Sequence, residues 1–264
     1  MQKQQIDRFN EWFDKYVAHL YGDDDYVNAN IKLKEDHSRR VCRQIRYLAR
    51  ELKLSADKKR LAEAIALFHD IGRFEQFKKY RTYSDHRSID HSTFGLEVLA
   101  KNNALAGVDR GEKKIIETAI RFHNVMELPA GLDEDVLLFS QLIRDADKLD
   151  IYYVVAQYYK EYEKNPEGFK LEIELPDSPV ITAKVIEDLV AGRHIDYRDL
   201  KSWNDMKLCQ LSWVYDVNFA TTLKRIKELG YIEMIIGFLP KTDGVQKAAS
   251  AVQTYIDRRI ANRI

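Results

Sequence analysis

The 264-residue chain has little cysteine, no net charge and no long apolar run. Its two cysteines, Cys42 and Cys209, show no motif spacing, so we expect neither a disulfide framework nor a thiolate metal site. Lysine plus arginine and aspartate plus glutamate both number 42. A chain without net positive charge has no global field that attracts nucleic acid or anionic lipid, so we expect neither nucleic acid nor membrane among its partners.

No segment approaches the roughly 20 apolar residues that a membrane-spanning helix needs. The opening MQKQQIDRFNEWFDKY has no apolar signal core, so the expected location is the cytoplasm. The hydrophobic fraction of 45% is typical of a globular protein with a sizeable core.

Helical periodicity extends over most of the chain. In RRVCRQIRYLARELKL the apolar residues recur every three or four positions, and the same spacing returns in DKKRLAEAIALFHD and GEKKIIETAIRFHN. Alternation typical of strands is scarce, and only KLEIEL, residues 170–175, favours a short strand. The pattern therefore predicts an all-α fold.

A break in this periodicity divides the predicted helices into two groups. The segment YEKNPEGFKLEIELPDSP holds three of the five prolines, which favour turns over helix. We predict one domain over residues 1–162 and a C-terminal helical lobe over residues 163–264, packed together as one globule.

Several ionisable side chains fall on the apolar faces of these predicted helices. They are His37, His69, His123 and Asp147. His69 lies four residues after Ile65, and residues three or four apart share a helix face. His37 is expected at the start of its helix. Asp70 lies about 100° from His69 around an ideal helix, and a helix end at Gly72 is expected to let both side chains reach one point.

Burying ionisable groups without partners costs several kcal/mol, so this pattern favours a bound cation. Imidazole and carboxylate together suit Mn, Fe, Co, Ni or Zn better than Ca, and Mg also stays a candidate. We therefore predict a site for one or two divalent metal ions.

Three short elements resemble the H, HD and D motifs of the HD-domain metal-dependent phosphohydrolase superfamily. They are HSRRV with His37, HDIGR with His69 and Asp70, and DADKL with Asp147, and their order and helical context agree over roughly residues 30–155. The resemblance implies an HD-type helical bundle in which these four residues bind metal.

Two neighbouring carboxylates compete with Asp147 for the last motif position. Asp145 and Asp150 lie close by in the sequence. We prefer Asp147 because it shares a helix face with Ile143 and precedes KL, as in the motif of the resembling family.

Two further histidines lie where HD families carry extra ligands or phosphate contacts. His91 is in DHSTFGLEVL and His123 in AIRFHN. By this resemblance they would bind a second metal ion bridged by Asp70, or protonate the leaving oxygen. Asp70 would orient or deprotonate a metal-activated water in phosphoester hydrolysis.

Basic residues follow the HD element in GRFEQFKKYRTYSDHRSIDHS. Arg73 is the preferred phosphate contact and a member of the predicted catalytic set, because guanidinium can bind phosphate through two hydrogen bonds. Lys148, Arg81 and His86 are the other candidate substrate-binding residues.

The resemblance implies a small-molecule phosphoester as substrate, and nucleotides lead because they are the commonest substrates in the superfamily. The segment NVMELPAGL after His123 lacks the GYP motif of the cyclic-dinucleotide subgroup. Two alternatives stay open. One is an HD module that binds a nucleotide without turnover, and the other is a di-iron oxygenase, because some HD-fold enzymes oxidise their substrates.

Overall fold

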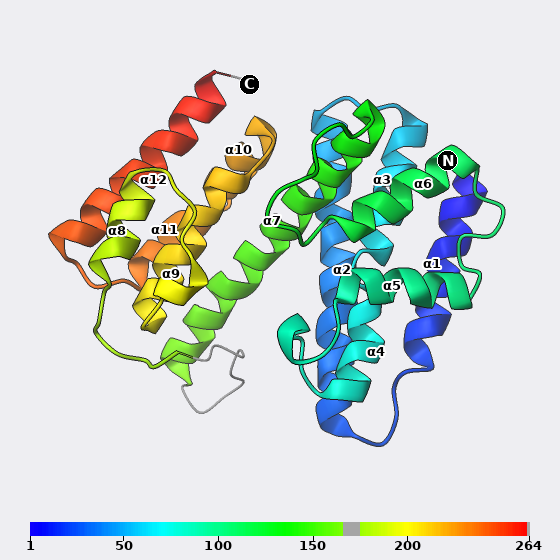
Figure 1. Ribbon diagram of the computed structural model, residues 1–264, viewed down its shortest axis with the longest axis horizontal. Coiled ribbons are helices and arrows are strands. Elements are labelled where there is room, and N and C mark those ends of the chain that lie inside the picture. The colour runs from blue at the N-terminus through cyan, green and yellow to red at the C-terminus, as the bar shows by residue number, and fades with distance from the viewer. Residues whose placement is uncertain (166–174, 263–264) are drawn as a thin grey trace. The chain divides into compact units, whose positions relative to one another are not determined.

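The computed structural model describes residues 1–165 and 175–262 (Figure 1). Within these ranges the chain forms helices and no strand, so the all-α prediction is confirmed. The strand predicted for residues 170–175 falls on a segment of which only Leu175 lies among the described residues.

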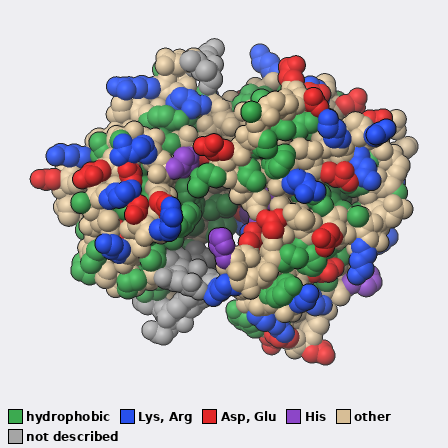
Figure 2. Space-filling model, in the orientation of Figure 1, with side chains coloured by type: hydrophobic (Ala, Val, Ile, Leu, Met, Phe, Trp, Pro, Cys, Tyr) green, Lys and Arg blue, Asp and Glu red, His purple; other side chains and the backbone are tan. Residues whose placement is uncertain are grey.

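The chain divides into two compact units, unit 1 over Met1–Asp147 and unit 2 over Lys148–Ile264. The predicted division into residues 1–162 and 163–264 stays a prediction. Within the described ranges, every helix is too short or too polar to span a bilayer. On the face drawn in Figure 2, basic and acidic side chains are interspersed over both units.

Unit 1 is built from helices that pack around a shared core (Figure 1). They are α1 (Lys3–Ala18), α2 (Asp25–Glu51), α3 (Ala56–Phe68), α4 (Ile71–Tyr80), the 3₁₀ turn η1 (Asp85–Arg87), α5 (His91–Lys101), α6 (Arg110–Arg121) and the first part of α7 (Glu134–Lys164). Helix α2 packs against α3 and α4, while α5 packs against α4 and α6.

Helix α2 begins well before the first histidine motif. The Asp24 carboxylate accepts a hydrogen bond from the backbone N–H of Val27, which caps the helix at its first turn. The expectation that His37 starts its helix is therefore wrong, because buried Val27 and Ile31 extend the apolar face toward the N-terminus. His37 lies inside α2, where neighbouring turns on both sides fix its direction.

The chain breaks at the HD pair. Helix α3 ends at Phe68, His69 is its C-cap, and Asp70 occupies the N-cap position of α4. Asp70 has φ −106° and ψ 17°, outside the helical region, so it redirects the chain between the two helices. This break lets two adjacent side chains point into the same space, which a continuous helix would not allow.

Gly72 does not end a helix, as the sequence suggested, but lies in the first turn of α4. A Cβ atom at this position would lie 2.6 Å from the backbone nitrogen of Gly95 in α5 and closer still to the carbonyl oxygen of His91. Glycine is required here because α4 and α5 approach each other through their backbones. This close approach brings the start of α5 next to Asp70.

Unit 2 contains the rest of α7 and a second group of helices (Figure 1). They are α8 (Ala183–Val190), η2 (Tyr197–Asp199), α9 (Trp203–Ser212), η3 (Trp213–Asp216), α10 (Ala220–Glu228), α11 (Tyr231–Gly237) and α12 (Asp243–Ala261). Helix α12 packs against α8 and α10, and α9 packs against α8 and α11.

Candidate metal centre

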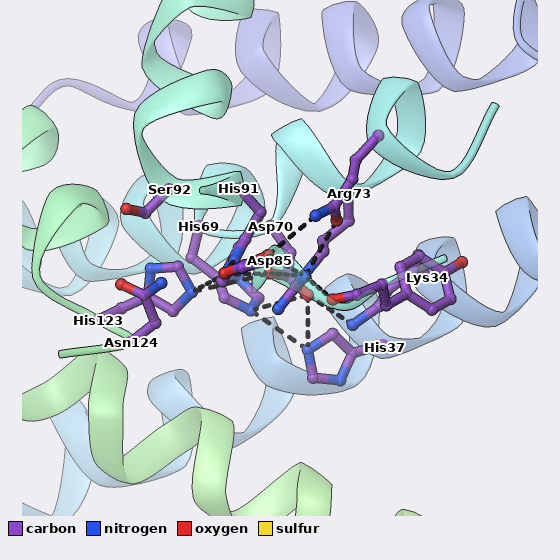
Figure 3. Close-up of polar contacts among 12 residues, drawn as sticks. Lys34, His37, His69, Asp70, Arg73, Asp85, His91, Ser92, His123 and Asn124 are labelled. Atoms are coloured by element: carbon purple, nitrogen blue, oxygen red, sulfur yellow. Dashed lines mark hydrogen bonds and ion pairs between the residues drawn. The ribbon is translucent and has the colours of Figure 1, made fainter. Parts of the chain in front are cut away.

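Imidazole and carboxylate groups from separate helices meet in the core of unit 1 (Figure 3). The cluster consists of His37 from α2, His69 and Asp70 from the α3–α4 junction, His91 from the start of α5, His123 just after α6, and Asp147 from α7. All except Asp147 are at most 6% exposed. The structure therefore brings together every residue that the sequence predicted as a metal ligand.

One side of the cluster, which we call position A, lies between His37, His69, Asp147 and one oxygen of Asp70. His37 Nε2 lies 3.2 Å from His69 Nε2 and 3.2 Å from Asp147 Oδ1. Asp70 Oδ2 lies 3.4 Å from His37 Nε2. Position A is thus surrounded by two imidazole nitrogens and two carboxylate oxygens.

The other side, position B, lies between His91, His123 and the second oxygen of Asp70. Asp70 Oδ1 lies 3.4 Å from His91 Nε2 and 3.7 Å from His123 Nε2. The two Nε2 atoms are 3.0 Å apart. Because its two oxygens face opposite sides of the cluster, Asp70 is shared between the two positions.

Hydrogen bonds on the far side of the rings assign the histidine tautomers. His69 Nδ1 donates to Ala66 O at 2.8 Å, and His123 Nδ1 donates to Ile120 O at 2.7 Å. A carbonyl oxygen only accepts, so Nδ1 carries the proton and the Nε2 of each neutral ring presents a lone pair to the cluster.

His91 has the same tautomer, but its partner is a carboxylate. His91 Nδ1 lies 2.6 Å from Asp85 Oδ2 and donates to it. Burial lowers the pKa of His91 to about 4, although the hydrogen bond to Asp85 opposes this shift. His91 Nε2 and His123 Nε2 lie 3.0 Å apart. In the Nδ1–H form of both rings their lone pairs face each other, which is unfavourable unless a cation lies between them.

Both cluster carboxylates are held in the ionised form. Burial alone would raise the pKa of Asp70, but the ammonium of Lys34 outweighs it and holds that pKa well below its usual value. Burial likewise opposes the ionisation of Asp147, and its pKa lies well below the usual value when His37 and His69 carry a proton on Nε2 and donate to it; a cation at position A would take the same part. Asp147 Oδ1 is nevertheless buried without a hydrogen-bond partner among the described residues.

These observations fit divalent metal ions. Ligand atoms about 2.1 Å from a metal at angles of 90° to 109° lie about 3.0 to 3.4 Å from each other. The Nε2 separations of 3.0 Å and 3.2 Å match this spacing. A cation would also satisfy the facing lone pairs and the unpartnered oxygen of Asp147.

Comparison with known families agrees with this geometry. Residues 35–152 match the family described as HD domain. These residues form an HD domain. The match spans all three motifs seen in the sequence, so the resemblance to the metal-dependent phosphohydrolase superfamily, whose HD domains bind divalent metals, is confirmed. The chain has no significant match among curated proteins or solved structures.

A partly buried lysine directly before the matched residues contacts the cluster, and the sequence reasoning missed it. Lys34 Nζ lies 2.8 Å from Asp70 Oδ2 and 5.1 Å from the centre of the Tyr83 ring (Figure 3). The Tyr83 hydroxyl donates to Asn30 O at 2.9 Å, which fixes the ring. Lys34 precedes His37 by three residues on α2, so the helix-face argument that selected His37 would also have found it.

Arg73 lies beside the cluster, as predicted, but its guanidinium is already engaged. Arg73 Nη1 donates to Asp85 Oδ1 at 2.8 Å, to Gln76 Oε1 at 3.0 Å and to the carbonyl oxygen of Tyr83. Its Nε lies 3.6 Å from Asp70 Oδ1. The predicted contact between Arg73 and phosphate stays a prediction.

The structure does not bring the remaining candidate substrate-binding residues to the HD cluster. Arg81 pairs with Asp24 at 2.9 Å, and the Lys148 ammonium pairs with the Asp216 carboxylate. His86 is exposed in η1. In the described ranges no contact joins these three side chains to the cluster, and their roles stay predictions.

Proposed function

We propose that the HD domain hydrolyses a phosphoester of a small molecule, with a nucleotide as the leading substrate class. The observation that supports it most directly is the position of Asp70, which offers one oxygen to each side of a four-imidazole cluster. A shared carboxylate of this kind suits a pair of ions about 3.5 to 4 Å apart.

The bound metal would lower the pKa of a water molecule and polarise the phosphoryl oxygen. His37, His69 and Asp147 would hold the ion at position A, while His91 and His123 would hold the ion at position B. Asp70, ionised and shared by both positions, would orient the attacking water and accept its hydrogen bond.

The tautomers favour metal binding over proton transfer for the two histidines of position B. The Nδ1 proton of His123 is donated to Ile120 O, and that of His91 is donated to Asp85. Their Nε2 atoms carry the lone pairs and are therefore ligands rather than acids. The Lys34 ammonium beside Asp70 is the cation best placed to contact a phosphate near the cluster.

The same ligands leave a second candidate function. Four imidazoles and two carboxylates are also a suitable ligand set for iron, so the di-iron oxygenase stays an alternative. Iron as the active metal and oxygen consumption on addition of substrate would distinguish it from a hydrolase.

The decisive experiment is phosphate release from a panel of nucleotide monoesters and diesters with Mn, Co, Ni, Mg or Fe(II). Metal-dependent turnover should appear in the wild type, and Asp70→Ala should lower kcat/KM by at least about a thousandfold. Asp36→Ala is the matched control, because Asp36 is a half-exposed carboxylate paired with Lys32 on α2.

Undiminished turnover in Asp70→Ala would refute hydrolysis at this cluster. Tight nucleotide binding without turnover for any metal would favour the sensing module, and oxygen uptake with iron alone would favour the oxygenase.

A further inference from the structure

Position B contains one histidine whose orientation its own helix cannot fix. His69 and His123 each donate from Nδ1 to the carbonyl oxygen three residues earlier, which the preceding helical turn supplies. His91 is the first residue of α5, and the residues directly before it are not helical. Its Nδ1 therefore requires an acceptor from elsewhere, and Asp85 supplies it.

Both oxygens of Asp85 are engaged. Oδ2 accepts the hydrogen bond from His91 Nδ1 at 2.6 Å. Oδ1 accepts from Arg73 Nη1 at 2.8 Å and from Gln76 Nε2 at 2.9 Å. Because partners act on each oxygen, the carboxylate can neither rotate nor move away without losing hydrogen bonds.

Gln76 ties the segment that carries Asp85 to α4. Its side chain is wholly buried, and Nε2 lies 2.9 Å from Ser88 Oγ and 2.9 Å from Ile89 O in addition to Asp85. Helix α4 begins directly after Asp70. The position of Asp85 is therefore coupled to the helix whose N-cap is the shared carboxylate.

We propose that Asp85 is a positioning residue that holds His91 as an Nε2 ligand and thereby controls whether position B binds an ion. This inference rests on the proposed metal centre. Position B is the side that such control would affect most, because it has one carboxylate oxygen and two imidazoles, whereas position A also has Asp147. A ligand lost from position B leaves few others to retain the ion.

The test counts bound metal and does not depend on hydrolysis. Wild type, Asp85→Ala and Asp85→Asn are titrated with Co(II), followed by visible absorption and by metal analysis after dialysis. We expect two ions per chain in the wild type. Asp85→Ala should bind one ion normally and the second about 10- to 100-fold more weakly. Asp85→Asn should lose less, because its amide oxygen can still accept the hydrogen bond that His91 Nδ1 donates.

Ser88→Ala is the matched control. It removes a hydrogen bond between Gln76 and the same segment but leaves the Asp85–His91 contact intact, so both ions should bind as in the wild type. The thermal midpoint of each metal-free variant separates loss of folding from loss of orientation.

Three results would overturn the proposal. The first is two tightly bound ions in Asp85→Ala. The second is equal metal loss in Asp85→Ala and Ser88→Ala, which would reduce Asp85 to a structural role. The third is a single ion in the wild type, which would remove position B while leaving a mononuclear hydrolase intact.

Discussion

Each unit buries an aspartate almost completely, and the two carboxylates have opposite surroundings. Asp205 in unit 2 accepts hydrogen bonds from Thr182 N at 2.8 Å, from Thr182 Oγ1 at 2.7 Å and from Lys201 N at 2.8 Å. Asp70 in unit 1 occupies an N-cap position, yet its side chain makes no capping hydrogen bond with the described residues. Its neighbours are imidazole nitrogens and the Lys34 ammonium.

This comparison shows that burial alone does not distinguish a structural carboxylate from a metal ligand. Asp205 satisfies its oxygens with donors that join the start of α9 to the segment before α8. Asp70 faces Nε2 atoms, and the tautomers of His69, His91 and His123 make those atoms acceptors. The identity of the neighbouring atoms, and not the depth of burial, indicates which carboxylate requires a cation.

Among the tests of this comparison, we expect the replacement of Asp147 to have the largest effect. Its Oδ1 is buried without a hydrogen bond among the described residues and lies 3.2 Å from His37 Nε2. Asp147→Ala should release the ion at position A and lower kcat/KM by about a thousandfold, equivalent to about 4 kcal/mol. Metal analysis and phosphate release measure both effects, and the helical circular dichroism should be unchanged.

Asp145→Ala is the control for Asp147→Ala, because Asp145 is a neighbouring carboxylate on the same helix, α7, and is wholly buried. Its metal content should equal that of the wild type. Metal loss in the Asp145 variant alone would show that the sequence argument chose the wrong carboxylate.

Sequence reasoning succeeded where a regular helix fixes the direction of a side chain. His37 and Asp147 were found because each falls on the apolar face of its predicted helix, and each now lies at position A. The HD pair was also found, although its adjacent side chains converge because α3 and α4 break between them, not because of a glycine.

Sequence reasoning failed where contacts cross between segments. Asp85 lies between α4 and α5, and its link to His91 depends on hydrogen bonds from Gln76 and Arg73 that no local periodicity encodes. Gly72 was interpreted as a helix terminator because glycine often follows a helix. Its role instead depends on the backbone of α5, which is distant in sequence.

A smaller effect is expected for the structural carboxylate. Asp205→Ala would leave the donors at Thr182 and Lys201 without their buried acceptor, so the free energy of unfolding should fall by about 3 kcal/mol. The metal content should be unchanged. Urea unfolding followed by fluorescence measures the loss, since Trp203 and Trp213 both belong to unit 2.

Asp257→Ala is the matched control in unit 2, since its side chain is 59% exposed and pairs with Lys227. Its free energy of unfolding should change by less than about 1 kcal/mol. If Asp205→Ala instead lost metal and kept its stability, the contrast between the two buried aspartates would be wrong.

The smallest effect is expected for the replacement of Lys34, which tests why its ammonium lies beside Asp70. Lys34→Met removes a positive charge 2.8 Å from Asp70 Oδ2, so metal ions should bind at least as tightly as before. Inorganic phosphate should bind the metal-loaded protein about tenfold more weakly, equivalent to about 1.4 kcal/mol, because an anion loses a cationic partner. Calorimetry with phosphate measures the difference, and Lys32→Met, which removes an exposed lysine from α2, should behave as the wild type. Unchanged phosphate affinity in Lys34→Met would mean that Lys34 serves only as a hydrogen-bond donor to Asp70, as Thr182 and Lys201 serve Asp205 in unit 2.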